Sequence, residues 1–227
     1  MNCRPLTLKN VPVPRTWDAR LARRLVTPLA DTFVTPNHLT TLRLLIGLAG
    51  GLCLARGGFA SINAGALLIV LSNFVDHTDG ELARISGKSS RIGHFYDLVC
   101  DALVTILLFV GMGLGIGSVH EAERVVPGVL LGSLAGVAVA MIFFLRMRIE
   151  DMEGKAGIRQ ASVAGFETED VLYLLPLVTL TGIVTPFVVA ASIGAPLFAL
   201  WVIVDFRRAR RRTVRPATEN SQRQVRP

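Results

Sequence analysis

Four aspartates, spaced for two helical faces, are the residues of this sequence best suited to chemistry. Asp76 and Asp79 are three residues apart, and Asp97 and Asp101 are four apart, so each pair lies on one face of a helix. Two such faces turned toward each other form a cup of four carboxylates, the kind of site that hard divalent cations prefer. Because acidic side chains are costly at membrane depth, their position between apolar segments indicates function.

Small residues and an arginine accompany these acids. Gly80 and Ala83 follow Asp79 within about one helical turn, and small side chains there let a ligand approach the backbone. Arg84 carries a fork of donors suited to phosphate oxygens, and Gly93 precedes the second pair of aspartates. The set therefore predicts a metal–pyrophosphate site, in which one carboxylate can also act as general base toward a hydroxyl.

Two alternatives do not involve this chemistry. The acids can pair with Arg84, Lys88 and Arg91 at a helix hairpin, which accounts for one or two aspartates but not for four on two helical faces. They can also line the path of a divalent-cation transporter, although transport sites usually lie near the bilayer midplane. The aspartates lie toward the ends of their apolar segments, which favours an enzyme that works at the membrane surface.

Membrane helices are the elements that must position these acids. Apolar residues make up 51% of the 227, in blocks long enough to cross a bilayer. We therefore expect an all-α integral membrane protein, with an N-terminal cytoplasmic segment (1–36), a six-helix transmembrane catalytic domain (37–206) and a basic, disordered tail (207–227). The six expected spans are approximately 38–56, 60–85, 92–116, 125–145, 170–187 and 189–206.

The polar segments predict the orientation. Trp17, Leu21, Leu25 and Leu29 recur every four residues with arginines between them, which predicts a short amphipathic helix at the membrane interface. Lys and Arg are concentrated at the N-terminus, near positions 88 and 150 and in the tail. Both termini and the aspartates are therefore expected on the cytoplasmic side of a bacterial inner membrane. These clusters account for the net charge of +7, and no nucleic-acid partner is expected.

Taken together, these residues resemble a known family, the CDP-alcohol phosphotransferases. The chain matches all eight fixed positions of the family signature, Asp76-x₂-Asp79-Gly80-x₂-Ala83-Arg84-x₈-Gly93-x₃-Asp97-x₃-Asp101. The run Pro36-Asn37-x-Leu39-Thr40-x₂-Arg43 also resembles the opening of the first span in bacterial members. With the expected helices included, the resemblance covers about residues 17–206.

The resemblance implies a reaction of phospholipid biosynthesis and a role for each motif residue. Asp76, Asp79 and Asp97 are expected to hold divalent metal, Mg²⁺ or Mn²⁺, while Asp101 helps to bind a second ion and acts as the base. The acceptor hydroxyl attacks the β-phosphorus of a CDP-activated lipid, here expected to be CDP-diacylglycerol, and CMP leaves. Members are commonly homodimers. The expected nucleotide-binding residues are Gly80, Ala83, Arg84, Gly93, Asn37 and Thr40.

The acceptor, a small polar alcohol or phospho-alcohol, stays open. A phosphorylated acceptor needs a second anion site, for which the candidate residues are Arg43, Arg146, Arg148, Lys155 and Arg159. The positive-inside bias also explains basic residues in the loop near position 150, and Arg43 can reach the membrane surface instead. The acidic Glu167, Glu169 and Asp170 can alternatively meet an amino or polyol acceptor, or begin the fifth span, where a helix dipole favours negative charge.

Overall fold

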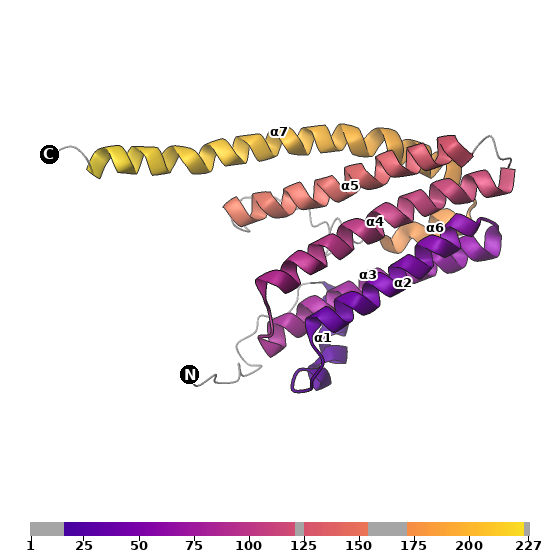
Figure 1. Cartoon of the computed structure of the whole chain (residues 1–227), viewed down its shortest axis with the longest axis horizontal. Helices are drawn as coiled ribbons and strands as arrows, with labels where there is room; N and C mark the ends of the chain where they lie inside the picture. Colours follow the sequence, from indigo (N-terminus) through magenta and orange to yellow (C-terminus); the bar gives the residue numbers. More distant parts are fainter. Residues whose placement is uncertain (1–15, 121–124, 154–171, 225–227) are drawn as a thin grey trace.

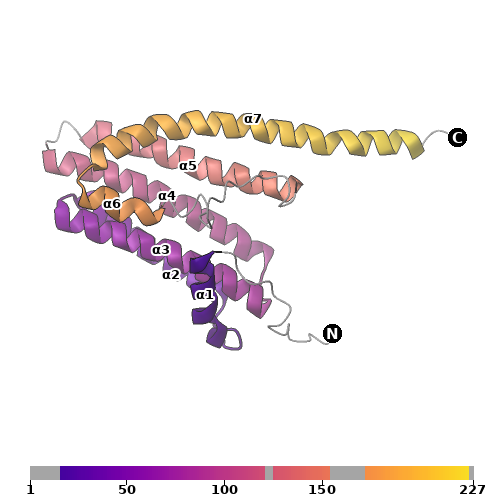
Figure 2. The ribbon, with the colours of Figure 1, turned by 180° about the vertical axis from the view of Figure 1, so that it is seen from behind.

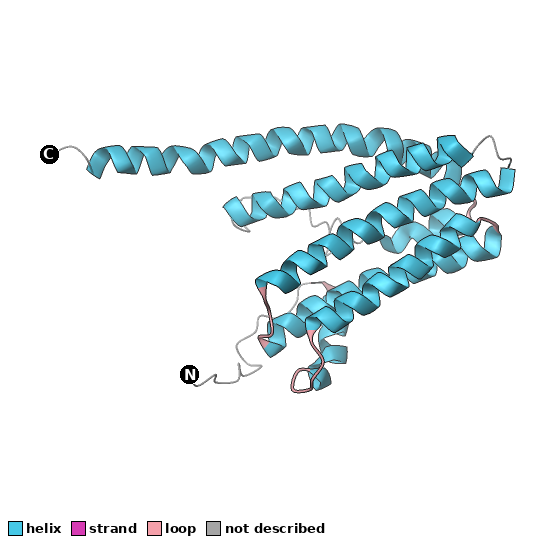
Figure 3. Cartoon of the chain, in the orientation of Figure 1, coloured by secondary structure: helices cyan, strands magenta, loops and turns pink. Residues whose placement is uncertain are grey.

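A computed structural model describes residues 16–120, 125–153 and 172–224, and every regular element in these ranges is a helix. Figure 3 shows this helical content along the chain. The elements are α1 (Trp17–Val26), the 3₁₀ turn η2 (Thr27–Leu29), α2 (Pro36–Arg56), α3 (Phe59–Ser86), α4 (Arg91–His120), α5 (Val125–Glu153), α6 (Leu175–Leu180) and α7 (Val184–Gln224).

Five of these helices, α2, α3, α4, α5 and α7, are long and apolar enough to cross a membrane. The described part of the chain is thus an all-α integral membrane protein with a short N-terminal helix, as the apolar blocks predict. Many large apolar side chains on the long helices remain exposed, as expected for surfaces that contact lipid tails.

The segment predicted as the fifth span differs from expectation. Within it the structure has the short α6, which ends at Leu180, and a turn at 181–183 leads into α7. Gly182 adopts a φ of 72° in this turn, a backbone conformation that glycine reaches without steric cost. The predicted break near residue 188 is therefore wrong, because the chain turns earlier. The first part of the predicted span lies outside the described residues.

The last helix is also longer than expected. The sequence predicts a disordered tail from Arg207 onward, whereas α7 continues without a break to Gln224. Arginine and alanine, which are frequent just after Phe206, are both good helix formers. The end of the apolar run at this point marks a change of environment and not the end of a helix.

The long helices lie side by side along one direction (Figure 1). α2 packs against both α3 and α4, α4 packs against α5, and α5 packs against α7. The same arrangement seen from behind (Figure 2) shows α6 beside α3 and α1 lying across the bundle near the start of α2. Since α2 lies between α3 and α4, residues near its start are able to contact both helices that carry the aspartates.

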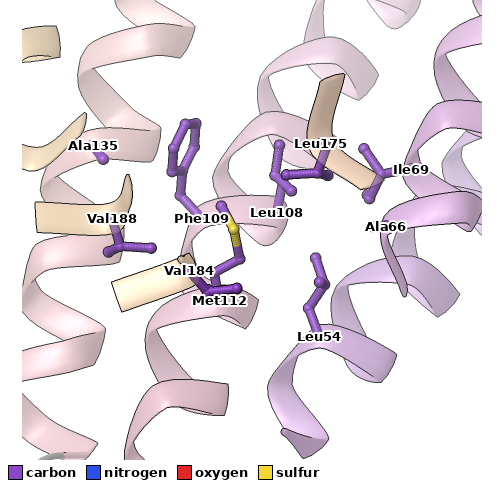
Figure 4. Packing of buried hydrophobic residues seen from close by; sticks show 10 residues of the cluster. All are labelled: Leu54, Ala66, Ile69, Leu108, Phe109, Met112, Ala135, Leu175, Val184 and Val188. Carbon is purple, nitrogen blue, oxygen red and sulfur yellow. The ribbon is translucent and has the colours of Figure 1, made fainter. Parts of the chain in front are cut away.

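A hydrophobic core joins these helices away from the aspartates. It includes Leu54 of α2, Ile69 of α3, Met112 of α4 and Val188 of α7, all essentially buried. Figure 4 shows these side chains pointing toward one another between the ribbons. This core fixes the relative positions of α2, α3 and α4, and thereby the positions of the polar residues farther along the same helices.

Glycines allow the helices to approach closely. A Cβ at Gly47 would collide with the side chain of Val104, where α2 crosses α4, and a Cβ at Gly113 would collide with the carbonyl of Gly128, between α4 and α5. Small residues of this kind let helix backbones meet, as is common in membrane helix packing. Since these contacts lie within one chain, the glycines already have a use that involves no partner subunit.

Gly113→Ala is expected to destabilise the fold by about 1–3 kcal/mol, because the added methyl group has no room between α4 and α5. Gly194→Ala in α7 is the matched control, since a Cβ there meets nothing within 4 Å. Thermal unfolding of the purified variants in detergent measures the difference. Equal shifts in unfolding temperature would contradict a close α4–α5 contact.

Candidate functional site

The first turn of α2 is held in place by its N-cap. Thr35 is the N-cap residue, its amide donates to His38 Nδ1 at 3.3 Å, and Pro36 occupies the first helical position, where its fixed φ suits a helix start. With this start, Thr40 and Arg43 lie three residues apart, on the same face of α2. Both side chains contact the predicted aspartates.

Carboxylates from two helices meet beside this face of α2. Asp76 of α3 and Asp97 and Asp101 of α4 each place one oxygen within 4.8 Å of the others. Oxygens on opposite sides of a Mg²⁺ ion lie about 4 Å apart, because each metal–oxygen distance is about 2.1 Å. The three residues therefore fit a divalent cation, and their donor set, carboxylate oxygen alone, suits Mg²⁺ or Mn²⁺.

Asp79, the fourth predicted ligand, has a different partner. Its Oδ2 accepts a hydrogen bond of 2.7 Å from the hydroxyl of Thr40, and it is not among the three residues whose oxygens gather. This bond ties α3 to α2 at the edge of the carboxylate cluster. Thr40 was expected beside a nucleotide, and the structure places it on a motif aspartate.

Arg43 lies among the three gathered carboxylates. It is 2% exposed, its Nη1 donates to Asp76 and, at 3.1 Å, to Asp97, and its Nη2 donates to Asp101. The sequence left open whether this side chain reaches the membrane surface or meets an anion, and here it meets the protein's own anions. One guanidinium thus offsets part of the charge of three carboxylates, which would be very unfavourable if buried without a cation.

The predicted nucleotide-binding residues of α3 line an open surface. A Cβ at Gly80 would meet nothing within 4 Å, and Ala83 is half-buried one turn later. The side chain of Arg84 is 60% exposed while it donates to Glu81. Space for a ligand therefore adjoins this turn of the helix.

The other two predicted nucleotide-binding residues lie next to each other. A Cβ built on Gly93, at the start of α4, would lie 2.7 Å from Asn37 Oδ1, so only glycine fits beside that side chain without a shift. One turn farther on, the hydroxyls of Thr41 and Tyr96 are 3.0 Å apart. The starts of α2 and α4 thus meet through polar groups, close to the carboxylate cluster.

A cavity of about 500 Å³ adjoins the carboxylates on the side of α5 and α7. Asp76, Asp101 and Arg146 line it, together with Phe198 of α7. The Arg146 guanidinium lies over the ring of Phe198, 5.3 Å from its centre, which is the geometry of a cation–π contact. The apolar part of the lining includes Phe95, Leu98, Val99, Ala102, Ile142, Phe143, Phe144 and Met147.

The remaining acceptor candidates are not brought to this cavity in the described part of the chain. Arg148 is exposed and is absent from the lining. Lys155 and Arg159 lie outside the described residues, as do the acidic alternatives at positions 167, 169 and 170. Apart from Arg43, which binds the carboxylates themselves, Arg146 is therefore the candidate that the described part of the chain brings to the cavity.

Contacts between α1 and α3 were not predicted. Asp18 is buried, its Oδ2 lies 2.9 Å from His77 Nε2, and it accepts a hydrogen bond of 3.2 Å from the Tyr173 hydroxyl. Burial alone would raise the pKa of Asp18, but hydrogen bonds and the nearby His77 hold that pKa below its ordinary value. A second pair joins Arg23 to Glu81 at 2.6 Å.

A sequence signal for these contacts existed. His77 and Glu81 are four residues apart on the motif helix, so they share a face. Asp18 and Arg23 flank the stripe that begins at Trp17 in the amphipathic helix. By contrast, nothing in the sequence marked Phe198, which comes from a distant helix.

Arg43→Gln is expected to lower the unfolding temperature of the metal-free protein, because three carboxylates that are 24–45% exposed lose their shared cation, at a cost below the roughly 3–5 kcal/mol of a fully buried pair. The same change removes a positive charge from the predicted metal site, so Mn²⁺ should raise the unfolding temperature of the variant more than that of the wild type. Arg91→Gln, at an exposed position of α4, is the control. A smaller response to Mn²⁺ in Arg43→Gln would contradict the assigned role.

Comparison with known proteins gives the family. Residues 33–202, most of the chain, match the CDP-alcohol phosphatidyltransferase family. The archaetidylinositol phosphate synthase of Methanothermobacter thermautotrophicus is 29% identical over 133 residues, which are 57% of this chain and 61% of that protein. The bifunctional IPC transferase and DIPP synthase of Rubrobacter xylanophilus is 31% identical over 127 residues, 56% of this chain but only 27% of that protein.

Solved structures agree in fold. The phosphatidylinositol phosphate synthase of Mycobacterium tuberculosis, crystallised with CDP-DAG, superimposes with a TM-score of 0.55 at 24% identity, covering 86% of this chain and 94% of that one. Its complex with manganese and citrate gives a TM-score of 0.53, also at 24% identity, and covers 86% and 88% of the two chains. With the family match extending from before α2 into α7, this chain belongs to the CDP-alcohol phosphatidyltransferase family.

Proposed function

We propose that this chain transfers a phospho-alcohol group, the phosphatidyl group of CDP-diacylglycerol, to the hydroxyl of a small polar alcohol and releases CMP. A bond forms between the acceptor oxygen and the β-phosphorus, and the bond from that phosphorus to the oxygen bridging toward CMP breaks. The hydroxyl proton passes to a carboxylate, and CMP leaves with the bonding electrons. The product is a phospholipid with a new phosphodiester.

The observation that carries this proposal is that two of the three clustered carboxylates also line the cavity. Asp76 and Asp101 both belong to the cluster and to the cavity wall. A hydroxyl group that enters the cavity therefore comes within reach of Asp101, the proposed base. Positioning a hydroxyl beside a carboxylate that takes its proton is general-base catalysis.

The other residues of the chain have supporting roles in this scheme. Asp76, Asp97 and Asp101 would hold divalent metal, with Asp79 completing the set that serves two ions. When bound, such metal neutralises pyrophosphate charge and stabilises the leaving oxygen. Gly80, Ala83 and Arg84 would lie along the nucleotide, joined by Asn37, Thr40 and Gly93 across the cluster. The apolar walls of the cavity suit the lipid part of a substrate.

We also propose the topology expected from the charges. Basic residues flank both α1 and the end of the apolar part of α7, and the positive-inside rule would put both on the cytoplasmic side. An even number of crossings is then required, which the six spans predicted from the sequence would supply. The exposed apolar side chains of α1 support an interfacial position for that helix. A homodimer remains a prediction from the family resemblance alone.

The acceptor is proposed to be a phosphorylated polyol such as inositol phosphate. Arg146 supports this choice, because it is a cation in the lining of the same cavity as Asp101, and arginine binds phosphate through paired donors. Two of the similar proteins are named for phosphatidylinositol phosphate and archaetidylinositol phosphate synthesis. An unphosphorylated alcohol would bring no phosphate to this arginine.

Asp101→Asn is expected to lower the rate of CMP release by at least about 10²–10⁴-fold, since the amide cannot accept the hydroxyl proton. The assay uses purified protein in lipid, Mn²⁺, CDP-diacylglycerol and a panel of acceptors. Asp31→Asn, an exposed position in the loop before α2, should leave the rate unchanged. The divalent-cation transporter alternative requires nucleotide-independent Mn²⁺ flux in proteoliposomes, with no CMP released by the wild type.

Arg146→Ala is expected to raise KM for inositol phosphate by about 10- to 100-fold, the usual effect of losing a hydrogen bond to a charged group. The acceptor panel includes glycerol 3-phosphate, inositol phosphate, inositol, serine and choline. Inositol phosphate should give the most CMP with the wild type. If an unphosphorylated alcohol is used best, and Arg146→Ala does not alter its KM, the proposed acceptor class is wrong.

A further inference from the structure

The motif helix α3 is contacted by α1 on one side and carries the predicted nucleotide surface on another. His77 and Glu81 contact α1 through Asp18 and Arg23, at 2.9 Å and 2.6 Å respectively. Apolar packing adds to these contacts, because Val26 lies in one buried cluster with residues of α3. α1 is thus attached to the same turns of α3 that bear the first half of the signature, from Asp76 to Arg84.

Glu81 connects α1 to the nucleotide side of the helix. It is 1% exposed, its Oε2 accepts from Arg23 Nε, and its Oε1 accepts from Arg84 Nη1. Each oxygen of one buried carboxylate is therefore bound to a different arginine. Because Arg23 holds this carboxylate in one orientation, the carboxylate does not rotate when the Arg84 side chain moves. Glu81 therefore gives the Arg84 guanidinium a fixed partner.

The arginine at the outer end of this chain of contacts is available to a ligand. Arg84 is 60% exposed, and its guanidinium carries more donors than the one that Glu81 takes. Arg84 also follows Gly80, where open space adjoins α3. A long arginine side chain loses much rotamer freedom when it binds a ligand, and an anchor that holds it in advance reduces that loss.

We propose that Glu81 and Arg23 are positioning residues, which hold Arg84 in the orientation that receives the anionic part of a CDP-activated donor. The inference rests on the proposed function. It makes donor binding depend on α1, whose opposite face exposes Trp17 and Leu25. The lipid surface that holds α1 would then also hold the nucleotide arginine in place.

The test measures donor binding and turnover separately. Arg23→Ala and Glu81→Gln should each raise KM for CDP-diacylglycerol by about five- to tenfold, with kcat changed less than about twofold, and should weaken binding of CDP in calorimetry by the same factor. Arg24→Ala removes the same charge from an exposed position of α1 and should change neither quantity. In an Arg84→Ala background, Arg23→Ala should raise KM no further.

A merely structural role gives a different result. Loss of folded protein lowers kcat through the active fraction, with KM and the CDP affinity unchanged, and that outcome overturns the inference. So does a further rise in KM when Arg23→Ala is added to Arg84→Ala, because Arg23 would then act elsewhere. If the wild type releases no CMP with any acceptor, the proposed function fails, while the calorimetric comparison of CDP binding still decides the role of Glu81.

Discussion

Negative charge gathered inside a membrane protein requires a cation, and this requirement organises the structure. Three carboxylates from two helices approach within 4.8 Å of one another, an arrangement that repulsion and desolvation would oppose without a positive partner. Arg43 supplies that partner from a third helix. The same carboxylate geometry fits a divalent ion, so the charge balance of the fold and the proposed chemistry depend on the same few atoms.

Helix α2 is the element through which this balance is reached. Its first turns carry Thr40 and Arg43, which bind aspartates on α3 and α4, and glycine farther along, at Gly47, lets it pack closely on α4. Polar contacts at one end and close apolar packing beyond it thus fix the same three helices. Because α2 lies between α3 and α4, the two halves of the signature meet beside it.

The signature helix is supported on more than one side. α1 binds it through two pairs that involve charged or titratable groups, Asp18 with His77 and Arg23 with Glu81, while the cavity toward α5 and α7 lies beside Asp76. The partly buried ion pair between Arg23 and Glu81 adds geometric definition as well as attraction. Asp76 of the proposed site therefore lies on a helix that α1 holds in place, whereas Asp97 and Asp101 come from α4 and Arg146 comes from α5.

The sequence determined much of this by local rules. Apolar block length predicts six spans, five of which are spanning helices in the described residues, the spacing of Asp97 and Asp101 predicts their shared face, and the matched signature predicts the family. These features can be predicted from the sequence because each depends on a helical period or a motif within a short stretch. The break before α7 was misplaced, since a turn at Gly182 needs only one local conformation and leaves little trace in hydropathy.

Tertiary structure alone decided the partners. The sequence contained Arg43 and Arg146 as equivalent anion-binding candidates, but packing of α2 put Arg43 among the aspartates, whereas α5 and α7 put Arg146 over Phe198 at the cavity. It also separated Asp79 from the carboxylate cluster and joined it to Thr40. The reason is physical: spacing along one helix tells which side chains share a face, whereas the groups that this face meets depend on which helices pack against it.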